Sequence, residues 1–171
     1  MSADPRYPIG SFVDSGDRSP ERRRELIAQI AALPARLREI LANLNDQQLD
    51  RPYRDGGWTV RQVVHHLADS HVHAYTRFKF AAVEDQPQVK GYAENDWANL
   101  PEAKSMPVSV SLEILSGIHS RWSEFLRHLP AEAFERAYLH SERGPETLAR
   151  ALELYVWHGE HHLAHIRNAP R

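Results

Sequence analysis

The sequence predicts an all-α protein, a four-helix bundle with a long crossover loop. Apolar residues recur at spacings of three and four over four long stretches, which is the period of an amphipathic helix. Strict alternation of apolar and polar residues, which indicates a half-buried strand, is scarce. The 171 residues suffice for one hydrophobic core and are too few for two ordinary domains. We therefore expect one domain over residues 1–171.

The first helix is expected to begin at Ser19, with Pro20 in its first turn, where the missing N–H of proline costs nothing. It continues through ERRRELIAQIAALPARLREILANL, and Pro34 is expected to kink it. Its apolar stripe consists of Ile27, Ile30, Leu33, Leu37 and Leu41. A polar connection, NDQQLDRPYRDGG, follows this helix.

The second helix is expected from Val60 to Val83, with Thr59 as its N-cap and Gln62 as the capping-box partner. It carries the segment HHLADSHVH. Residues 84–107 contain prolines, a glycine and no sustained period, apart from a possible short turn around 94–100. Such a long crossover is expected to cover a site.

The third helix fits residues 109–129 and is ended by Pro130. The fourth begins at Glu146 or Thr147 and runs to about Asn168, so it carries the histidine-rich stretch WHGEHHLAHI. The apolar stripe of the third helix consists of Leu112, Leu115, Ile118, Trp122, Phe125 and Leu129.

Composition excludes several classes of function. Twenty-one basic residues against 23 acidic ones give a formal charge of −2, which favours neither nucleic acid nor an anionic membrane as a partner. The absence of cysteine excludes disulfides and thiolate metal sites, so imidazole and carboxylate are the strong ligands that remain. The N-terminal MSADPRYPIGSFVDSG has no apolar run of the secretory kind, and no segment approaches membrane-spanning length. We expect a soluble cytoplasmic protein.

Four of the eleven histidines lie in the stretch WHGEHHLAHI. On a helical wheel, their angles from the centre of the apolar face are roughly 60° (His162), 100° (His158), 120° (His165) and 160° (His161). The pair His158 and His162 is therefore favoured as the pair that faces the bundle interior. Two imidazoles one helical turn apart can converge on one metal ion.

The i, i+4 spacing of this pair is that of the helical H-E-x-x-H zinc motif. The motif itself is absent, because position 159 is glycine and the glutamate is Glu160. The residue that acts as the general base in those proteases is thus not in its place.

A third ligand is expected from the second helix, which offers His65, His66, His71 and His73. His71 lies nearest the centre of the apolar face, His66 borders that face, and His65 points away from it. The helical wheel ranks His71 and His66 about equally.

Two long segments carry a resemblance to a known family. PYRDGGWTVRQVVHHLADSHVHAYTRFK (52–79) and YVWHGEHHLAHI (155–166) closely resemble the YfiT branch of the DinB/YfiT-like metalloprotein family, and the N-terminal RYPIG agrees as well. The resemblance covers essentially the whole chain. It implies a four-helix bundle, commonly dimeric, with a divalent metal held by three histidines. Those family positions are occupied here by His66, directly before L-A-D, His158, after the tryptophan, and His162, four residues later.

The resemblance implies a metal-dependent hydrolase, or a thiol S-transferase that joins a low-molecular-weight thiol such as bacillithiol to an electrophile. One divalent ion per chain is expected, with zinc first and nickel or manganese as alternatives. Three protein ligands leave a coordination position open for water or a thiol. The alternative is a non-catalytic bundle that uses the metal for structure or for sensing, and a fourth protein ligand such as His71 would favour it. No catalytic residue is assigned, and the expected partners are a small-molecule substrate and a second copy of the chain.

The sequence gives less specific expectations for the polar and aromatic residues outside the proposed ligand set. His71 and His165 are expected beside the ligands, where they would orient them. Asp69 either accepts a hydrogen bond near the site or is an exposed carboxylate, and Arg54 and Arg61 either bind a substrate carboxylate or are exposed. The four tryptophans are expected in the core or in a pocket, with Trp97 in the crossover. Structural or surface roles are expected for His65, His73, His119, His128, His140 and His161.

Overall fold

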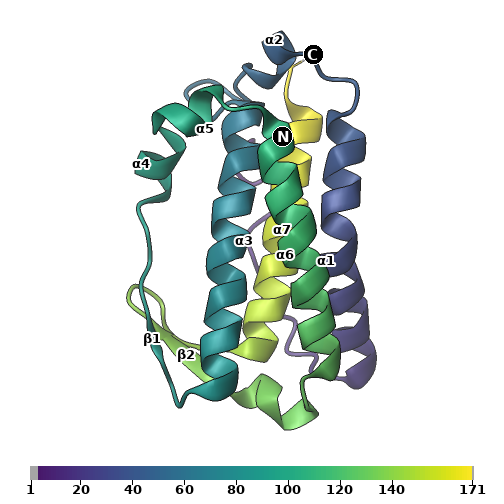
Figure 1. The fold of residues 1–171 in the computed structure, drawn as a ribbon, viewed down its shortest axis with the longest axis vertical. Helices are drawn as coiled ribbons and strands as arrows, with labels where there is room; N and C mark the ends of the chain where they lie inside the picture. Colours follow the sequence, from purple (N-terminus) through teal and green to yellow (C-terminus); the bar gives the residue numbers. More distant parts are fainter. Residues whose placement is uncertain (1–3, 171) are drawn as a thin grey trace.

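A computed structural model describes residues 4–170, so residues 1–3 and 171 of the predicted domain lie outside the described part. Four long helices lie side by side along the long axis of the molecule (Figure 1). α1 and α3 each pack against both α6 and α7. The chain is therefore an all-α four-helix bundle, as predicted. The bounds are Pro20–Leu41 for α1, Val60–Val83 for α3, Val108–His128 for α6 and Leu148–Asn168 for α7.

Local capping chemistry sets where the helices begin. Ser19 caps α1 by accepting a hydrogen bond from the backbone N–H of Arg22, and Thr147 caps α7 in the same way. The capping box predicted from Thr59 and Gln62 is present with both of its hydrogen bonds. α1 continues through Pro34, and the kink expected there stays a prediction.

The crossover connects the far end of α3 with the beginning of α6. It contains the strand β1 (Gln88–Val89) and two short helices, α4 (Glu94–Ala98) and α5 (Pro101–Ser105). Figure 1 shows it running back along the flank of α3, and α3 contacts both short helices. As a result α3 and α6 run in the same direction, and the crossover covers one side of α3.

A small three-stranded sheet lies at one end of the bundle and was not predicted. β2 (Ala137–His140) and β3 (Gly144–Thr147) form an antiparallel hairpin, and β1 pairs with β2 in parallel. The hairpin turn ends at Gly144, whose φ of +74° suits glycine. Strands of two to four residues are too short for alternation to be recognised in a sequence. The remaining elements are α2 (Asp46–Leu49) and the 3-10 helix η1 (Ala131–Glu135).

The apolar core consists of two clusters stacked along the bundle. The aromatic cluster includes Phe78, Trp122 and Tyr155 and lies towards the sheet. The aliphatic cluster is built from residues such as Leu37 and Leu67 and lies towards the other end. The apolar stripes predicted for the first and third helices contribute residues to both clusters.

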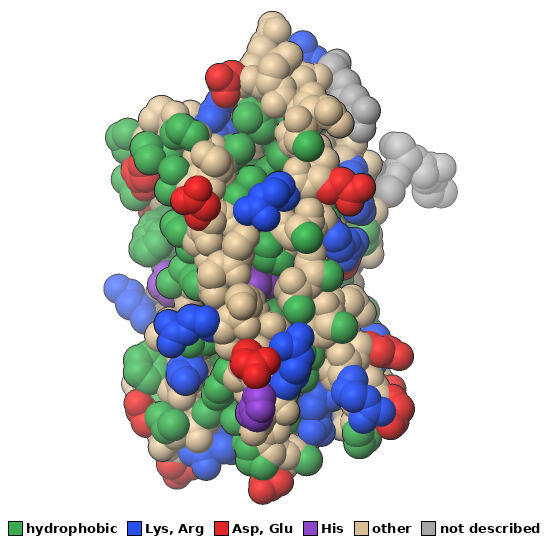
Figure 2. All heavy atoms as spheres, turned by 45° about the vertical axis from the view of Figure 1, so that its right-hand side comes forward, with side chains coloured by type: hydrophobic (Ala, Val, Ile, Leu, Met, Phe, Trp, Pro, Cys, Tyr) green, Lys and Arg blue, Asp and Glu red, His purple; other side chains and the backbone are tan. Residues whose placement is uncertain are grey.

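The surface agrees with the near-neutral composition. On the face shown in Figure 2, basic and acidic side chains are interspersed. Within residues 4–170, no helix is both long enough and apolar enough to cross a bilayer.

Candidate metal centre

A layer of histidines separates the two apolar clusters. α3, α6 and α7 change from apolar residues to histidine at the same level of the bundle and then return to apolar residues. Burial of so many imidazoles costs free energy unless each finds a partner. The layer consists of His66, His71, His119, His158 and His162.

Three of these histidines form a group in which the ligand nitrogens all lie within 4.8 Å of one another: His66, His158 and His162. The Nε2 atoms of His66 and His158 are 3.3 Å apart, although the two residues are separated by 92 positions. Within residues 4–170, no fourth ligand atom belongs to this group. The structure thus brings together the trio that the resemblance indicated and leaves His71 outside it.

The remaining two histidines of the layer determine how His158 presents its lone pair. The carbonyl oxygen of Ile30 can only accept, so Nδ1 of His119, 2.5 Å away, carries the proton. Nε2 of His119 then accepts from Nδ1 of His71 at 2.8 Å. Nε2 of His71 accepts in turn from Nδ1 of His158 at 3.1 Å. The chain of hydrogen bonds leaves the Nε2 lone pair of His158 directed at the trio.

The other two members of the trio have equivalent outer partners. Nδ1 of His66 lies 3.3 Å from the hydroxyl of Tyr92, which comes from the crossover. Nδ1 of His162 lies 3.3 Å from Nδ1 of His165. Metal-binding histidines characteristically bond their second ring nitrogen in this way, which fixes the tautomer and the ring orientation.

Burial keeps these imidazoles neutral. Desolvation lowers the pKa of His66 to about 4 and that of His119 to about 4. Burial also holds the pKa values of His71, His158 and His162 well below the usual value for histidine. At neutral pH each ring therefore offers an unprotonated nitrogen, which is the form that ligates metals.

The trio fits a divalent cation. Two Nε2 lone pairs that face each other repel, and a cation between them turns this repulsion into attraction. Two nitrogens that each lie about 2.0–2.1 Å from a tetrahedral ion are about 3.3–3.4 Å apart. The Nε2 atoms of His66 and His158 are 3.3 Å apart. Three neutral nitrogen donors without a fourth ligand suit a site with an open position.

A cavity of about 370 Å³ opens directly onto the trio. Trp58 forms one wall, with its ring centroid 4.8 Å from that of His66, and Trp157 and Arg54 also line the cavity. Glu94, from the first turn of α4, brings a carboxylate to the same cavity. Partial burial raises the pKa of this carboxyl above its usual value.

Sequence reasoning did not single out Glu94 or Tyr92. Both lie in the crossover, where no period indicates which side chains point inward. The one signal was the length of the crossover, from which a covered site was expected.

His161 and His165 are buried, although the helical wheel placed both away from the apolar centre. His161 stacks on Trp157, with ring centroids 4.6 Å apart, and Tyr7 of the N-terminal segment lies 6.1 Å from it. His165 stacks on Tyr53 at 4.0 Å. Segments outside α7 cover this face of the helix, and a helical wheel does not include them.

Most of the other histidines have structural contacts. His65 is held by Ser111 and by the carbonyl of Met106, and His73 stacks on Tyr92. His140 is buried in the sheet, whereas His128 is exposed at the end of α6. The structural or surface roles expected for these four agree with their positions.

Three charged residues considered from the sequence lie away from the trio. Arg61 is buried and donates to Asp50 and Asp46, so the alternative of an exposed residue is wrong, and binding of a substrate carboxylate stays a prediction. Asp69 makes no hydrogen bond to the trio within the described residues, and burial raises the pKa of its carboxyl to about 6. Glu160 forms an ion pair with Arg36 of α1.

We expect His71→Leu to weaken metal binding by about 10- to 100-fold while the protein stays folded, because leucine fills the space but cannot accept the proton of His158 Nδ1. The dissociation constant is measured by competition with a chromophoric chelator. His128→Leu, at an exposed position, is the matched control and should bind as the wild type does. An unchanged constant in His71→Leu would show that the hydrogen-bonded chain does not orient His158.

The sequence was compared with known proteins. The sequence model described as "DinB superfamily" matches residues 29–166. A protein of Bacillus cereus is 48% identical over 163 residues, which cover 95% of this chain and 94% of its own length. A protein of Bacillus mycoides shows the same identity and coverage. Both are named "Putative metal-dependent hydrolase".

A solved structure is also similar. YfiT from Bacillus subtilis superposes with a TM-score of 0.93 and 43% sequence identity, covering 96% of this chain and 95% of its own. It is described as "a probable metal-dependent hydrolase with an unusual four-helix bundle topology". The return of the crossover along α3, which makes α3 and α6 parallel, is a departure from the up-and-down bundle.

Proposed function

The chain belongs to the DinB superfamily and is a close relative of YfiT, and from this premise we propose that it is a metal-dependent hydrolase in which His66, His158 and His162 hold one divalent ion. The observation that carries the proposal is the convergence of three neutral imidazoles, with no fourth ligand from any residue that the structure describes. A structural metal site is normally closed by four protein ligands, whereas a catalytic one keeps a position open. His71, the residue best placed to close the shell, is bonded to Nδ1 of His158 instead.

Zinc is the ion we propose, with nickel or manganese as alternatives; imidazole suits zinc and nickel, whereas manganese prefers oxygen ligands. When bound, such an ion acts as a Lewis acid that polarises a substrate oxygen and makes a water or thiol at its open position more acidic. The outer partners Tyr92, His71 and His165 hold the three rings in place, so the ligand nitrogens need little reorganisation.

Glu94 is the residue we propose as the general base of hydrolysis. Its carboxylate lines the cavity above the trio, and its raised pKa brings it closer to the range in which a carboxylate accepts a proton efficiently. Glu94 would accept a proton from the water that attacks the ester or amide carbon, and would return it to the leaving group as the bond from that carbon to the leaving group breaks. The aromatic walls from Trp58 and Trp157 exclude part of the water around this transfer.

Thiol S-transfer is the second candidate. Within residues 4–170, no carboxylate is hydrogen-bonded to any of the three histidines, and Glu94 itself is an exposed residue. A thiol ionises more readily than water and needs less help from a base. This chemistry favours a small thiol as one substrate and an electrophile as the other.

The two candidates are separated by one experiment. The zinc-loaded protein is assayed against ester and amide substrates, and against a panel of small thiols with an electrophile. We expect Glu94→Gln to lower hydrolysis by about 10²- to 10⁴-fold, the usual contribution of a general base. Glu113→Gln, on the exposed surface of α6, is the matched control.

Each outcome of this assay has a clear meaning. Thiol-dependent turnover that survives in Glu94→Gln would show that the protein is a thiol S-transferase and not a hydrolase. Absence of turnover with every substrate, in a protein that binds the metal, would favour the non-catalytic alternative of a structural or sensing site.

A further inference from the structure

Arg77 is a buried cation without an ion-pair partner. Only 5% of its surface is exposed, and within residues 4–170 no carboxylate lies within 4.0 Å of its guanidinium. It donates one hydrogen bond to the hydroxyl of Tyr155 and one to the carbonyl oxygen of Lys90, both at 2.9 Å. A guanidinium has five N–H donors, so three remain without a partner among the described residues.

Such a charge is unfavourable inside a protein. Removing a guanidinium from water costs several kcal/mol unless an anion compensates it, and two neutral acceptors compensate it only in part. Arg136 makes the same kind of contacts, donating to two backbone carbonyls, but it is exposed and water completes its shell. Arg77 is buried and meets solvent only through the cavities that it lines.

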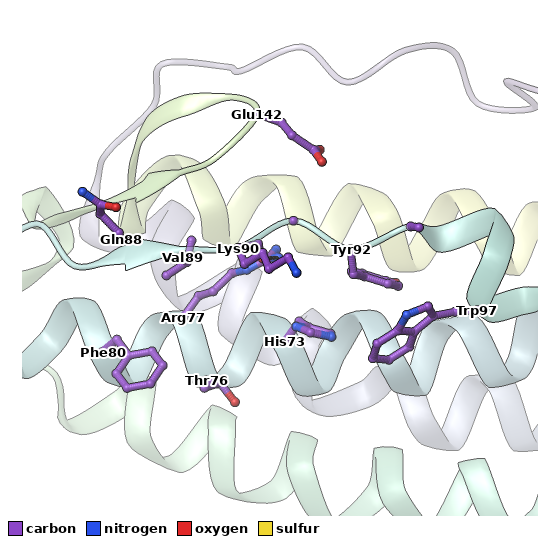
Figure 3. A pocket seen from close by; sticks show the side chains of 12 residues that line it. His73, Thr76, Arg77, Phe80, Gln88, Val89, Lys90, Tyr92, Trp97 and Glu142 are labelled. Carbon is purple, nitrogen blue, oxygen red and sulfur yellow. Dashed lines mark hydrogen bonds between the residues drawn. The ribbon is translucent and has the colours of Figure 1, made fainter.

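Arg77 lines two cavities that meet beneath the crossover. Figure 3 shows the first, of about 630 Å³, in which the Arg77 side chain extends from α3 towards Lys90, the residue that follows β1. The second, of about 200 Å³, contains Arg77, Tyr155 and His158. The second cavity therefore joins the unpaired guanidinium to a member of the trio. Tyr155, which accepts a hydrogen bond from Arg77, connects the two residues: its ring centroid lies 6.1 Å from that of His158.

Within residues 4–170, none of the other charged residues of the smaller cavity forms an ion pair with Arg77. Arg143 adds a second cation, although it pairs with Glu146 at 3.4 Å. Glu94 and Glu142 also line the cavity; Glu94 is only partly buried, Glu142 is exposed, and neither carboxylate lies within 4.0 Å of the Arg77 guanidinium. In Figure 3, Glu142 lies on the hairpin, on the far side of the strand from Arg77.

We propose that Arg77 binds the carboxylate of a small ligand in the cavity that it shares with His158, so that the substrate of the metal centre carries a carboxylate. The identification of this ligand as the substrate rests on the proposed function, whereas the binding itself does not. A carboxylate accepts two parallel N–H bonds from a guanidinium and supplies the missing negative charge. The reacting end of the same molecule then extends towards the trio.

The test compares two probes of similar length, 3-mercaptopropionate and 3-mercapto-1-propanol, which differ in the carboxylate. Their dissociation constants are measured by NMR titration with metal-free and with zinc-loaded protein. We expect the wild type to prefer the acid by about tenfold or more, because hydrogen bonds to charged groups contribute more than those to neutral ones. Arg77→Gln should abolish this preference and leave the affinity for the alcohol unchanged. Arg136→Gln is the matched control and should keep the preference.

Several outcomes would overturn the proposal: equal affinity of the wild type for both probes, an undiminished preference in Arg77→Gln, or no binding of the acid. If Arg77→Gln does not fold, the position of the bound acid in the wild-type protein tests the proposal. Nuclear Overhauser contacts from the probe to the ring of Tyr155 support the site, and contacts confined to other surfaces refute it. Preference for the acid in metal-free protein, with no turnover of any substrate when zinc is present, would refute the proposed function and leave the carboxylate site standing.

Discussion

Replacement of His162 by alanine is expected to lower the metal content of the purified protein from about one ion per chain to nearly none after dialysis. His162 is one of three nitrogen donors, and no fourth ligand of the described residues can take its place. Loss of one direct ligand should weaken binding by more than about 100-fold, the upper range for loss of an outer partner. Metal content is measured by mass spectrometry of the metal.

The melting temperature gives a second measurement of metal binding, which does not depend on how much metal stays bound during purification. A ligand that binds only the folded state raises its stability, so the melting temperature of the wild type should rise with added zinc. The melting temperature of His162→Ala should not. The metal-free variant is expected to stay folded, because the two apolar clusters above and below the histidines remain intact.

His161→Ala is the demanding control for this prediction. It also removes a buried imidazole from α7, and the ring centroid of His161 lies only 5.2 Å from that of His162. Since His161 is outside the trio, its loss should leave the metal content nearly unchanged. A His161→Ala protein without metal, or a fully metallated His162→Ala protein, would refute the assignment of the trio.

Replacement of Trp122 by alanine is expected to destabilise the fold by about 3–5 kcal/mol, the usual range for a large aromatic residue in a core. None of its surface is exposed, and its ring packs against Phe78 and Tyr155 with centroids 5.2 and 5.8 Å away. The free energy of unfolding is measured by urea denaturation of the metal-free protein. The ring of Trp122 also packs against His71 and His119, so metal affinity should fall as well.

Trp122→Phe separates packing from hydrogen bonding. The indole N–H of Trp122 is buried without a partner among the described residues, so its removal costs no hydrogen bond. Phenylalanine should therefore be tolerated better than alanine. A loss below about 1 kcal/mol in Trp122→Ala would mean that this part of the core relaxes around the cavity.

The long helices were predictable to within a few residues because their signals are local. Hydrogen-bonded caps such as Thr59 and an apolar stripe at a period of 3.6 depend on neighbours within one or two turns. The hairpin at 137–147 was missed, since strands of four residues gain their stability from partners distant in sequence.

The candidate site was only partly predictable from local pattern. Periodicity favoured His158 and His162, and it left His66 and His71 equal as the third residue. The resemblance to the family indicated His66, and in the structure His66 faces the pair while His71 bonds to His119. Which of two neighbouring histidines faces another helix depends on the rotation and height of that helix, and neither is encoded within one helix.

The sequence by itself determined that four amphipathic helices would form and that imidazole and carboxylate would be the strong metal ligands available, because helical period and residue type are local properties. Only the tertiary structure decided which groups surround the three histidines. Tyr92 and Glu94 reach them from the crossover, and the N-terminal segment covers His161. Arg77, which has no ion-pair partner among the described residues, is likewise covered by the crossover, where it donates to the carbonyl of Lys90. These arrangements result from long-range packing, which leaves no period in the chain.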